Sequence, residues 1–259
     1  MTTITANSNP KVKWVRRLQA QRSARHAEGH FVIEGARLLG EALKAGAQVP
    51  LVLHLESPDA DTRNLLDGFA ALGAQVMPVT SEIIELCSDT ETPQGLLAVV
   101  KVSESPIPPQ SEPLLIVDRV RDPGNLGTLM RSSLASRIAL MLLTPGTVDP
   151  LNPKVVRGAM GAHFHLPFKS ISIEELGDYV QGKTLWIAEA HSGVRYDYVD
   201  WTQPSALLIG GEASGPSEDV RQFTFKHVHI PISPVAESLN AAVAGSVLMF
   251  EMARQRGFK

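Results

Sequence analysis

The stretch PLLIVDRVRDPGNLGTLMR, residues 113–131, decides the fold of this chain. Its apolar run, residues 114–117, ends in Asp118, as in a buried strand that reaches the carboxyl edge of a sheet. The next segment, RDPGNLG at residues 121–127, is a polar turn whose glycines allow bare backbone to approach a ligand.

A helix is expected to start directly after this turn. Asp122 or Asn125 can cap it, and Arg131 then lies in its first turns. A strand, a polar glycine loop and a helix start, in that order, form the place where open α/β sheets bind ligands. The glycines alone also fit an ordinary βα turn, but the Asn and Arg six residues apart favour a functional site.

The composition describes an ordinary globular protein of 259 residues, 44% hydrophobic and 20% charged, with one large or two smaller domains. A net charge of −3 means that any nucleic-acid-binding surface must be local. The single cysteine, Cys87, excludes a disulfide framework and a cysteine zinc cluster, and suits a reducing compartment. Without a signal-peptide core or an 18-residue apolar run, no membrane contact and a cytoplasmic location are expected.

Strands and helices alternate twice along the chain, separated by the proline-rich segment SESPIPPQSE at residues 103–112. We therefore expect an N-terminal α/β domain over residues 1–105, which ends in this linker, and a second α/β domain over residues 106–259. The alternation predicts a parallel, doubly wound sheet for the second domain. Its strands are expected at residues 113–118, 138–143, 184–190, 206–212 and 226–232.

A basic helix is expected near the N-terminus, capped at Ser8-Asn9-Pro10 and with Trp14, Val15 and Leu18 as its apolar stripe. Residues 11–25 contain no acidic side chain. This local excess of basic residues could simply be a solvated helix face. Because the chain as a whole is net acidic, contact with RNA phosphates is the more specific hypothesis. The candidate RNA-binding residues are Lys11, Lys13, Arg16, Arg17, Arg22 and Arg25.

A second polar loop, IGGEASGP at residues 209–216, places Glu212 at a strand end between glycines. It lacks the dinucleotide-binding fingerprint and the P-loop lysine. A carboxylate in this position suits a ligand with hydroxyl, amino or cationic groups, although a glycine turn with a capping Glu is also possible.

The third loop, residues 229–240, precedes the last helix, expected over residues 238–256 with Ser238 as its N-cap. Asn240 is expected to be buried in the first turn and to need hydrogen-bond partners. The helix is expected to bury one face, formed by Leu239, Ala242, Val243, Ser246, Val247 and Phe250.

His163 and His165 alternate with apolar residues, as on a half-buried strand. The two could form a metal pair, but no third ligand lies nearby in the sequence, so no metal is expected.

The motifs D-P-G-N-L-G-x-x-x-R, G-G-E-x-x-G and I-P-I…E-S-L-N-A-A-V-A resemble, in order and separation, those of the SpoU (TrmH-type) RNA 2′-O-methyltransferases. The resemblance covers residues 113–256, and three ordered motifs together are highly specific. The N-terminal part is similar, more loosely, to the L30e-like substrate-binding domain of many members.

The resemblance implies an α/β-knot domain: a deep trefoil knot near the carboxyl end that holds S-adenosylmethionine. It also implies a homodimer with its site at the subunit interface. The implied cofactor-binding residues are Gly210, Gly211, Gly215, Ile230, Ile232, Ser238 and Leu239. The implied catalytic residues are Asn125, Arg131, Glu212, Ser238 and Asn240.

Two departures from the family pattern stand out. Residues 132–137, SSLASR, replace the usual small and acidic residues that lead to a Phe-Gly turn, and Ala213 stands where glycine is common. Neither removes a motif residue.

The expected reaction is transfer of a methyl group to a ribose 2′-hydroxyl. Arginine has a pKa above about 12, so Arg131 is expected to hold a phosphate or the forming alkoxide rather than to act as the base. Asn125 and Ser238 would orient the ribose and Arg131, and Glu212 would order its loop or bind a substrate donor.

Ribosomal RNA is the expected substrate because a separate domain carries the basic helix; transfer RNA is the alternative. A non-catalytic RNA-binding or ribosome assembly factor would require loss of a motif residue. A nucleotide-cofactor oxidoreductase lacks its fingerprint here.

Overall fold

The computed structural model describes residues 2–103, 105–211 and 215–257. It divides into two compact units, Met1–Ser103 with Asp149–Phe164, and Glu104–Val148 with His165–Lys259. The predicted division at residues 105/106 differs from this one mainly in residues 149–164, which were assigned to the second domain but pack with the N-terminal unit.

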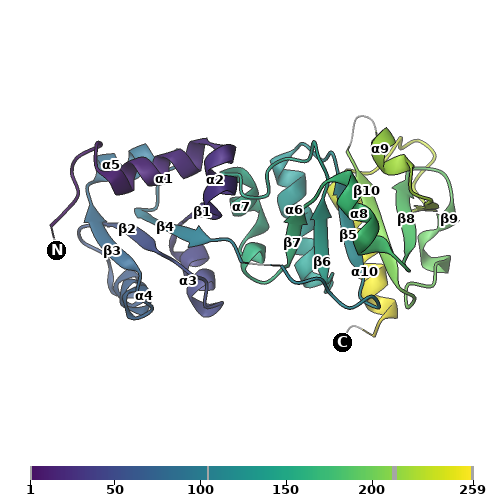
Figure 1. Ribbon diagram of the computed structural model, residues 1–259, viewed down its shortest axis with the longest axis horizontal. Coiled ribbons are helices and arrows are strands. Elements are labelled where there is room, and N and C mark those ends of the chain that lie inside the picture. The colour runs from purple at the N-terminus through teal and green to yellow at the C-terminus, as the bar shows by residue number, and fades with distance from the viewer. Residues whose placement is uncertain (1, 104, 212–214, 258–259) are drawn as a thin grey trace. The chain divides into compact units, whose positions relative to one another are not determined.

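The N-terminal unit is built on a mixed sheet with the strand order β1-β4-β2-β3 (Figure 1). β4 pairs antiparallel with β1 and β2, whereas β2 and β3 are parallel. The strands are β1 (His30–Glu34), β2 (Leu51–Leu55), β3 (Gln75–Val79) and β4 (Leu96–Lys101). The helices are α1 (Pro10–Ala20), α2 (Arg22–Glu28), α3 (Ala36–Lys44), α4 (Ala60–Ala71), α5 (Ser81–Cys87) and α7 (Pro153–Ala159).

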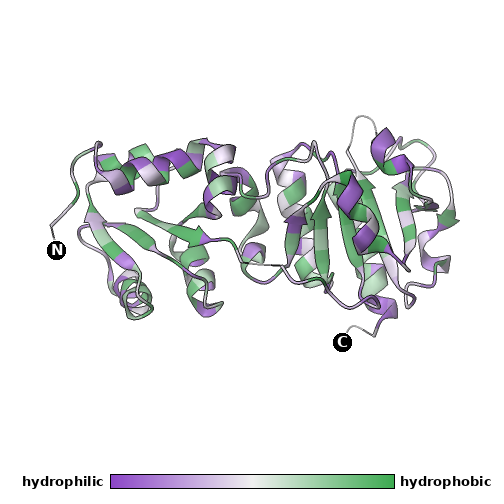
Figure 2. Ribbon diagram, in the orientation of Figure 1, coloured by the Kyte–Doolittle hydropathy of each residue, from purple (hydrophilic) through white to green (hydrophobic). Residues whose placement is uncertain are grey.

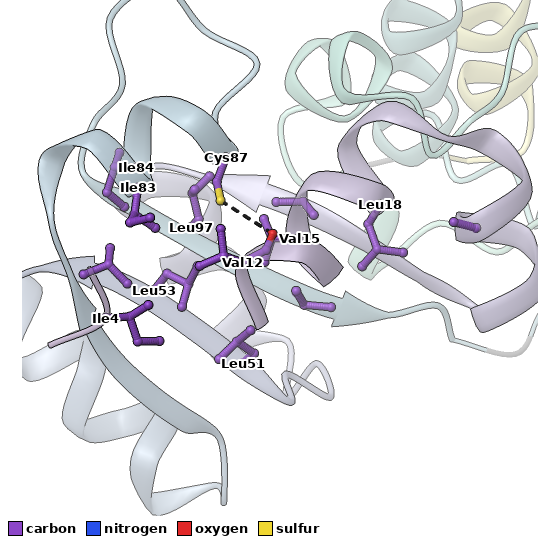
Figure 3. Packing of buried hydrophobic residues seen from close by; sticks show 14 residues of the cluster. Ile4, Val12, Val15, Leu18, Leu51, Leu53, Ile83, Ile84, Cys87 and Leu97 are labelled. Carbon is purple, nitrogen blue, oxygen red and sulfur yellow. Dashed lines mark hydrogen bonds between the residues drawn. The ribbon is translucent and has the colours of Figure 1, made fainter. Parts of the chain in front are cut away.

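A hydrophobic cluster forms the core beneath α1 and α5 (Figure 3). The helices contribute Val12, Val15, Leu18, Ile83, Ile84 and Cys87 to this cluster, and the strands contribute Leu51, Leu53 and Leu97 among others. Burial raises the pKa of the Cys87 thiol to about 11, and its sulfur lies 4.0 Å from the Val12 carbonyl oxygen. The cysteine is therefore a packing residue.

The predicted basic helix is confirmed in its start and corrected in its length. Asn9 caps α1 by accepting a hydrogen bond from the Lys11 amide, and Pro10 occupies the first turn. The helix breaks at Gln21, which has extended backbone angles, and α2 continues from Arg22. Val12 takes a buried position of the stripe, whereas Trp14 is only half-buried.

The basic side chains of α1 and α2 differ in their availability. Arg17 pairs with Glu28 at 2.6 Å. Arg25, predicted as a phosphate ligand, is only 4% exposed and forms an ion pair with Asp149 at 2.6 Å. Its guanidinium also donates to the Leu18 and Gln19 carbonyls. Through these contacts Arg25 anchors residues 149–164 within this unit. Because its side chain is buried, it is not available to bind RNA.

Residues 162–164 correct a second prediction, since they form a 3-10 turn, η1 (Ala162–Phe164), instead of a strand. The His163 ring is buried, with Nε2 2.7 Å from the Pro150 carbonyl oxygen, and burial lowers its pKa to about 4. The ring packs beside Phe31, with 5.5 Å between centroids, while His165 is exposed. No group of three potential metal ligands occurs in the described parts of the chain.

The C-terminal unit has a seven-stranded parallel sheet with the order β7-β6-β5-β10-β8-β11-β9, as the alternation predicted (Figure 1). The strands are β5 (Leu114–Asp118), β6 (Leu140–Leu143), β7 (Phe168–Ser170), β8 (Thr184–Glu189), β9 (Val194–Arg195), β10 (Ser205–Gly210) and β11 (Lys226–His229). The helices are α6 (Pro123–Ala135), α8 (Ile173–Val180), α9 (Glu218–Arg221) and α10 (Ala241–Gln255), with a 3-10 turn η2 (Tyr196–Tyr198).

Helices cover both faces of this sheet, whose central strands are strongly hydrophobic (Figure 2). Leu176 and Val180 of α8 pack on one face, in a cluster with buried side chains from β5, β6, β8 and β10. α6 and α10 pack on the other face, where a Cβ on Gly245 would lie only 2.6 Å from Leu129 and 3.2 Å from Ile209. Glycine at this position allows α10 to approach both α6 and the sheet.

The last helix differs from its prediction in the residue at which it starts and in the face that it buries. Its N-cap is Asn240, not Ser238: Oδ1 of Asn240 accepts from the Ala242 and Val243 amides at 2.9 and 3.2 Å. Because this cap is at the surface, Asn240 is exposed rather than buried. No helix in the described residues is long and apolar enough to cross a membrane.

The face of α10 that packs inside the unit is also different from the predicted one. The buried residues are Ala242, Gly245, Leu248, Met249, Met252 and Ala253. Leu239, Val243, Val247 and Phe250 were expected to be buried but are 37%, 49%, 36% and 45% exposed. We call the three on the helix itself, Val243, Val247 and Phe250, the α10 stripe. The helix is apolar on two sides, so periodicity alone could not tell which one packs inside.

Candidate cofactor and catalytic site

The site begins at the carboxyl end of β5, where the chain turns into α6. Asp122 caps this helix: its Oδ1 accepts a hydrogen bond from the Asn125 amide at 2.8 Å, and Pro123 takes the first position. Of the two predicted caps, Asp122 is therefore the one used. The cap uses the backbone amide of Asn125 and not its side chain.

Asp118 connects three loops at this edge of the sheet. Its fully buried carboxylate accepts hydrogen bonds from the Thr144 hydroxyl, which follows β6, and from the Ser217 amide at 2.6 Å. The Ser217 hydroxyl lies 3.3 Å from the same carboxylate. Buried carboxylates require such donors, so this network fixes the end of the second polar loop against β5.

A cavity lies beside this network, at the carboxyl ends of β8, β10 and β11, with ≈ 870 Å³ of space that is partly open to solvent. All seven predicted cofactor-binding residues line it: Gly210, Gly211, Gly215, Ile230, Ile232, Ser238 and Leu239. The structure thus brings together residues from two loops about 20 positions apart.

The glycines at the end of β10 are required by close backbone contacts. A Cβ on Gly210 would lie 2.7 Å from the Pro216 nitrogen, and one on Gly211 would lie 2.5 Å from the Arg119 carbonyl oxygen. Since backbone atoms cannot move aside as a flexible side chain can, only glycine fits at these two positions.

The predicted catalytic residues are only partly brought together. Asn240 Nδ2 donates to Asn125 Oδ1 at 2.9 Å, which joins the starts of α6 and α10. Ser238 lines the cavity, whereas Arg131 is exposed on α6 and is not among the lining residues. Glu212 lies outside the described residues.

Sequence reasoning missed several residues of the site. Asp118 was interpreted only as the end of a strand, and its partners Thr144 and Ser217 carried no signal. Glu189 lines the cavity from the carboxyl end of β8. A carboxylate at the end of an apolar strand is the pattern that could have drawn attention to both acids. Further lining residues are Ala188, Ala190, Ile209, Pro216, Val228, Ala241, Ala244 and Leu248.

Comparison with known proteins identifies the architecture. Residues 112–250, more than half of the chain, match the SpoU rRNA Methylase family. The chain belongs to this family. Residues 9–98 match a second model, the MRM3-like substrate binding domain.

The chain is also similar to named relatives along nearly its whole length. It is 30% identical to 23S rRNA (guanosine(2553)-2′-O)-methyltransferase RlmP of Bacillus subtilis, over 97% of this chain and 99% of that protein. It is 32% identical to the mitochondrial rRNA methyltransferase 3 of Homo sapiens, over 90% of this chain and 70% of that protein.

Solved structures of family members have the same fold. The AdoMet-bound rRNA methyltransferase from Sinorhizobium meliloti matches with a TM-score of 0.86 and 27% identity, over 98% of this chain and 97% of that chain. The SpoU methyltransferase AviRb from Streptomyces viridochromogenes, in complex with AdoMet, matches with a TM-score of 0.87 and 27% identity, over 96% and 98% of the two chains.

The Asp118 network predicts a measurable effect on stability and ligand binding. In Asp118→Asn, the amide offers one acceptor oxygen and directs its NH₂ group at a donor, so the C-terminal unit should lose about 2–3 kcal/mol of unfolding free energy. Loosening of the loop at Gly215 and Pro216 should also weaken binding in the cavity. Urea unfolding and calorimetric titration with S-adenosylmethionine measure the two effects.

Thr144→Val is the matched variant, because it removes only one donor and leaves the carboxylate bound to Ser217. Its effect should be smaller. An Asp118→Asn protein with wild-type unfolding and wild-type binding would contradict the role given to this network.

Proposed function

We propose that the protein is an S-adenosylmethionine-dependent methyltransferase that modifies a ribose 2′-hydroxyl of ribosomal RNA. The single observation that carries this proposal is the cavity, which gathers all seven cofactor-binding residues implied by the family motifs. The names of the relatives support ribosomal RNA over transfer RNA. Every motif residue is present in the sequence, which disfavours the non-catalytic alternative.

The cavity is chemically suited to the cofactor. Its apolar walls, which include Ile209, Val228 and Ile230, suit an adenine ring, and the loop ends at Gly210 and Leu239 offer backbone hydrogen-bonding groups. We further propose that the chain near β10 and α10 forms the trefoil knot of the family, and that the N-terminal unit has the L30e-like fold.

The reaction forms a C–O bond at the ribose oxygen while the C–S bond of the cofactor breaks and the hydroxyl proton leaves. When bound, S-adenosylmethionine supplies the electrophilic methyl group on its sulfonium. The chain must place the ribose oxygen in line with that group and stabilise the charge that develops. We assign positioning of the ribose to Asn125 and Ser238, and binding of the phosphate or developing alkoxide to Arg131.

Two further residues complete the proposed polar set. Asn240 holds Asn125 in place through their 2.9 Å hydrogen bond. Glu212 orders its loop or binds a substrate donor. We also propose a cytoplasmic location, because the single cysteine is buried as a free thiol, which suits a reducing compartment.

The first test concerns chemistry. Arg131→Ala and Asn125→Ala should reduce methyl transfer at least a hundredfold and leave cofactor affinity within about twofold, because neither residue lines the cavity. Arg131→Lys should fail as well, since a point charge cannot replace the planar guanidinium. Transfer of labelled methyl to ribosomal RNA and calorimetric cofactor binding are the two measurements.

An RNA substrate with a 2′-deoxy target nucleotide is the control, and it should accept no methyl group. Methylation of this substrate would show that a base is the target, and full activity in Arg131→Ala would remove Arg131 from the mechanism.

We propose next that the protein works as a homodimer that pairs through the α10 stripe. Val243, Val247 and Phe250 expose a continuous apolar face on α10, and each single chain leaves Arg131 outside the cofactor cavity. A second copy would cover the stripe and could supply the missing arginine.

Phe250→Glu should therefore convert the protein to a monomer, because a charge at the stripe cannot be buried without a partner, and methyl transfer should fall with it. Light scattering and the transfer assay measure the two effects. Leu72→Glu is the matched control: Leu72 is 63% exposed but belongs to the N-terminal unit, so this variant should remain dimeric. A fully active monomeric wild type would refute the pairing.

We propose finally that the exposed cations of α1 and α2 bind RNA phosphates. Lys13, Arg16 and Arg22 are exposed, whereas Arg17 is paired with Glu28 and Lys11 is half-buried. Replacing the first three by alanine should weaken RNA binding and lower the slope of log affinity against log salt by about 2–3.

The control removes the same charge from the same unit, by alanine at the exposed residues Arg37, Lys44 and Arg63. Equal losses of affinity and of salt slope in both triple variants would show that charge in general, and not the α1–α2 surface, attracts the RNA.

A further inference from the structure

Arg119 is a charged residue in a strained backbone position. It follows the last residue of β5 and has a φ of 57°, in the left-handed region that is unfavourable for arginine because the Cβ crowds the backbone. The other described non-glycine residues with positive φ, Arg137 and Met160, end α6 and α7, where this conformation is common. Arg119 ends no helix, and strained residues of this kind are concentrated at functional sites.

Contacts with two neighbouring loops fix the Arg119 backbone. Its amide donates to Thr147 Oγ1 at 3.0 Å, and the Thr147 hydroxyl donates to the Val117 carbonyl at 3.1 Å. On the other side, the Arg119 carbonyl oxygen would lie only 2.5 Å from a Cβ on Gly211, which lines the cavity. Arg119 is therefore held at the rim of the cavity, between the loops that follow β6 and β10.

The Arg119 side chain lies against the loop after β6 and not in the cavity. A Cβ on Gly146 would lie 3.3 Å from its Cγ and 3.6 Å from its Nε, so glycine leaves room for the arginine. β6 and β10 flank β5 on opposite sides, and Arg119 is not among the residues that line the cavity. The guanidinium group is therefore outside the cavity, on the β6 side of β5.

The positive charge of Arg119 has no partner in the described residues. No described group accepts a hydrogen bond from its guanidinium, although the side chain is half-buried. The nearest acids in the sequence are already engaged, Asp118 in the buried network and Asp122 with the Asn125 amide. Arg121 is exposed and likewise forms no ion pair within the described residues. The segment thus carries two uncompensated positive charges.

A phosphate is the ligand that matches this arrangement. A planar guanidinium with free donors can form two parallel hydrogen bonds to phosphate oxygens. The carboxylate of S-adenosylmethionine could also pair with an arginine, but that ligand belongs inside the cavity and the guanidinium lies outside it. When RNA presents a ribose to the cavity, the phosphates on either side of that ribose pass along the rim.

We propose that Arg119 binds a backbone phosphate next to the target nucleotide and so anchors RNA at the rim of the cavity. This inference rests on the proposed function, because it takes RNA to be the substrate. Arg119 precedes the first of the three motifs, so it adds a substrate-binding residue that the motifs do not contain.

The test replaces Arg119 by asparagine, which tolerates the left-handed conformation better. Arg119→Asn should therefore be at least as stable as the wild type in urea. It should bind RNA about tenfold more weakly, and the slope of log affinity against log salt should fall by about 0.7–0.9. The probe is ribosomal RNA transcribed in vitro, which carries no ribose methyl groups, and filter binding without cofactor measures its affinity.

Methyl transfer to the same RNA gives a second readout. The contact is present before and during the reaction, so Arg119→Asn should raise KM for RNA and leave kcat nearly unchanged. Calorimetric titration of the variant with S-adenosylmethionine and with 5′-methylthioadenosine should give wild-type affinities.

Two further variants complete the design. Arg137→Asn is the matched control, because it makes the same change at nearly the same φ, 58°, beyond the other end of α6. It should bind RNA as the wild type does. Arg119→Lys keeps the charge without the planar fork, so its loss of RNA affinity should be smaller than that of Arg119→Asn.

Other outcomes overturn the inference in distinguishable ways. Wild-type RNA affinity and salt slope in Arg119→Asn, or equal losses in Arg137→Asn, would refute the phosphate contact and leave the proposed function standing. Weaker binding of S-adenosylmethionine but not of 5′-methylthioadenosine, which lacks the carboxylate, would place Arg119 at the methionine end of the cofactor. A clear loss of stability in Arg119→Asn would make its role structural.

The proposed function can fail separately. A wild-type protein that transfers no methyl group, but whose salt-dependent RNA affinity still falls in Arg119→Asn, would reject the methyltransferase activity and retain the phosphate contact.

Discussion

The buried carboxylate of Asp118 is the interaction on which the site depends. Placing a carboxylate in the interior costs several kcal/mol unless hydrogen-bond donors surround it. Here the donors come from Thr144 and Ser217, which follow two other strands, so one side chain joins the ends of β5, β6 and β10. At the end of β10, next to this connection, the backbone of Gly210 and Gly211 packs too closely to admit a Cβ.

The sequence predicted those features that depend on local pattern. Apolar runs and their caps placed the first strand of the C-terminal unit at residues 113–118, and it is found at Leu114–Asp118; the helix predicted at Ile173–Val180 has those bounds. The motif resemblance went further and named seven residues that line one cavity, because the family relationship carries three-dimensional information that periodicity lacks.

Features decided by contacts between distant residues could not be predicted. Arg25 is indistinguishable from its basic neighbours until Asp149, 124 positions away, is seen to bind it. The buried face of α10 could not be chosen from a helix that is apolar on two sides. Likewise, Ser238 and Asn240 are both acceptable N-caps, and only the hydrogen bond from Asn240 to Asn125 shows why the second is used.

These observations separate two properties of the protein. The described residues of a single chain line one cavity, and the buried Asp118 network beside it also lies within that chain. Arg131, in contrast, is exposed outside that cavity, and the same unit exposes the α10 stripe. If a second copy both covers the stripe and brings an arginine to the cavity, cofactor binding belongs to the chain whereas methyl transfer belongs to the dimer. Assembly would then control catalysis without altering the cofactor site.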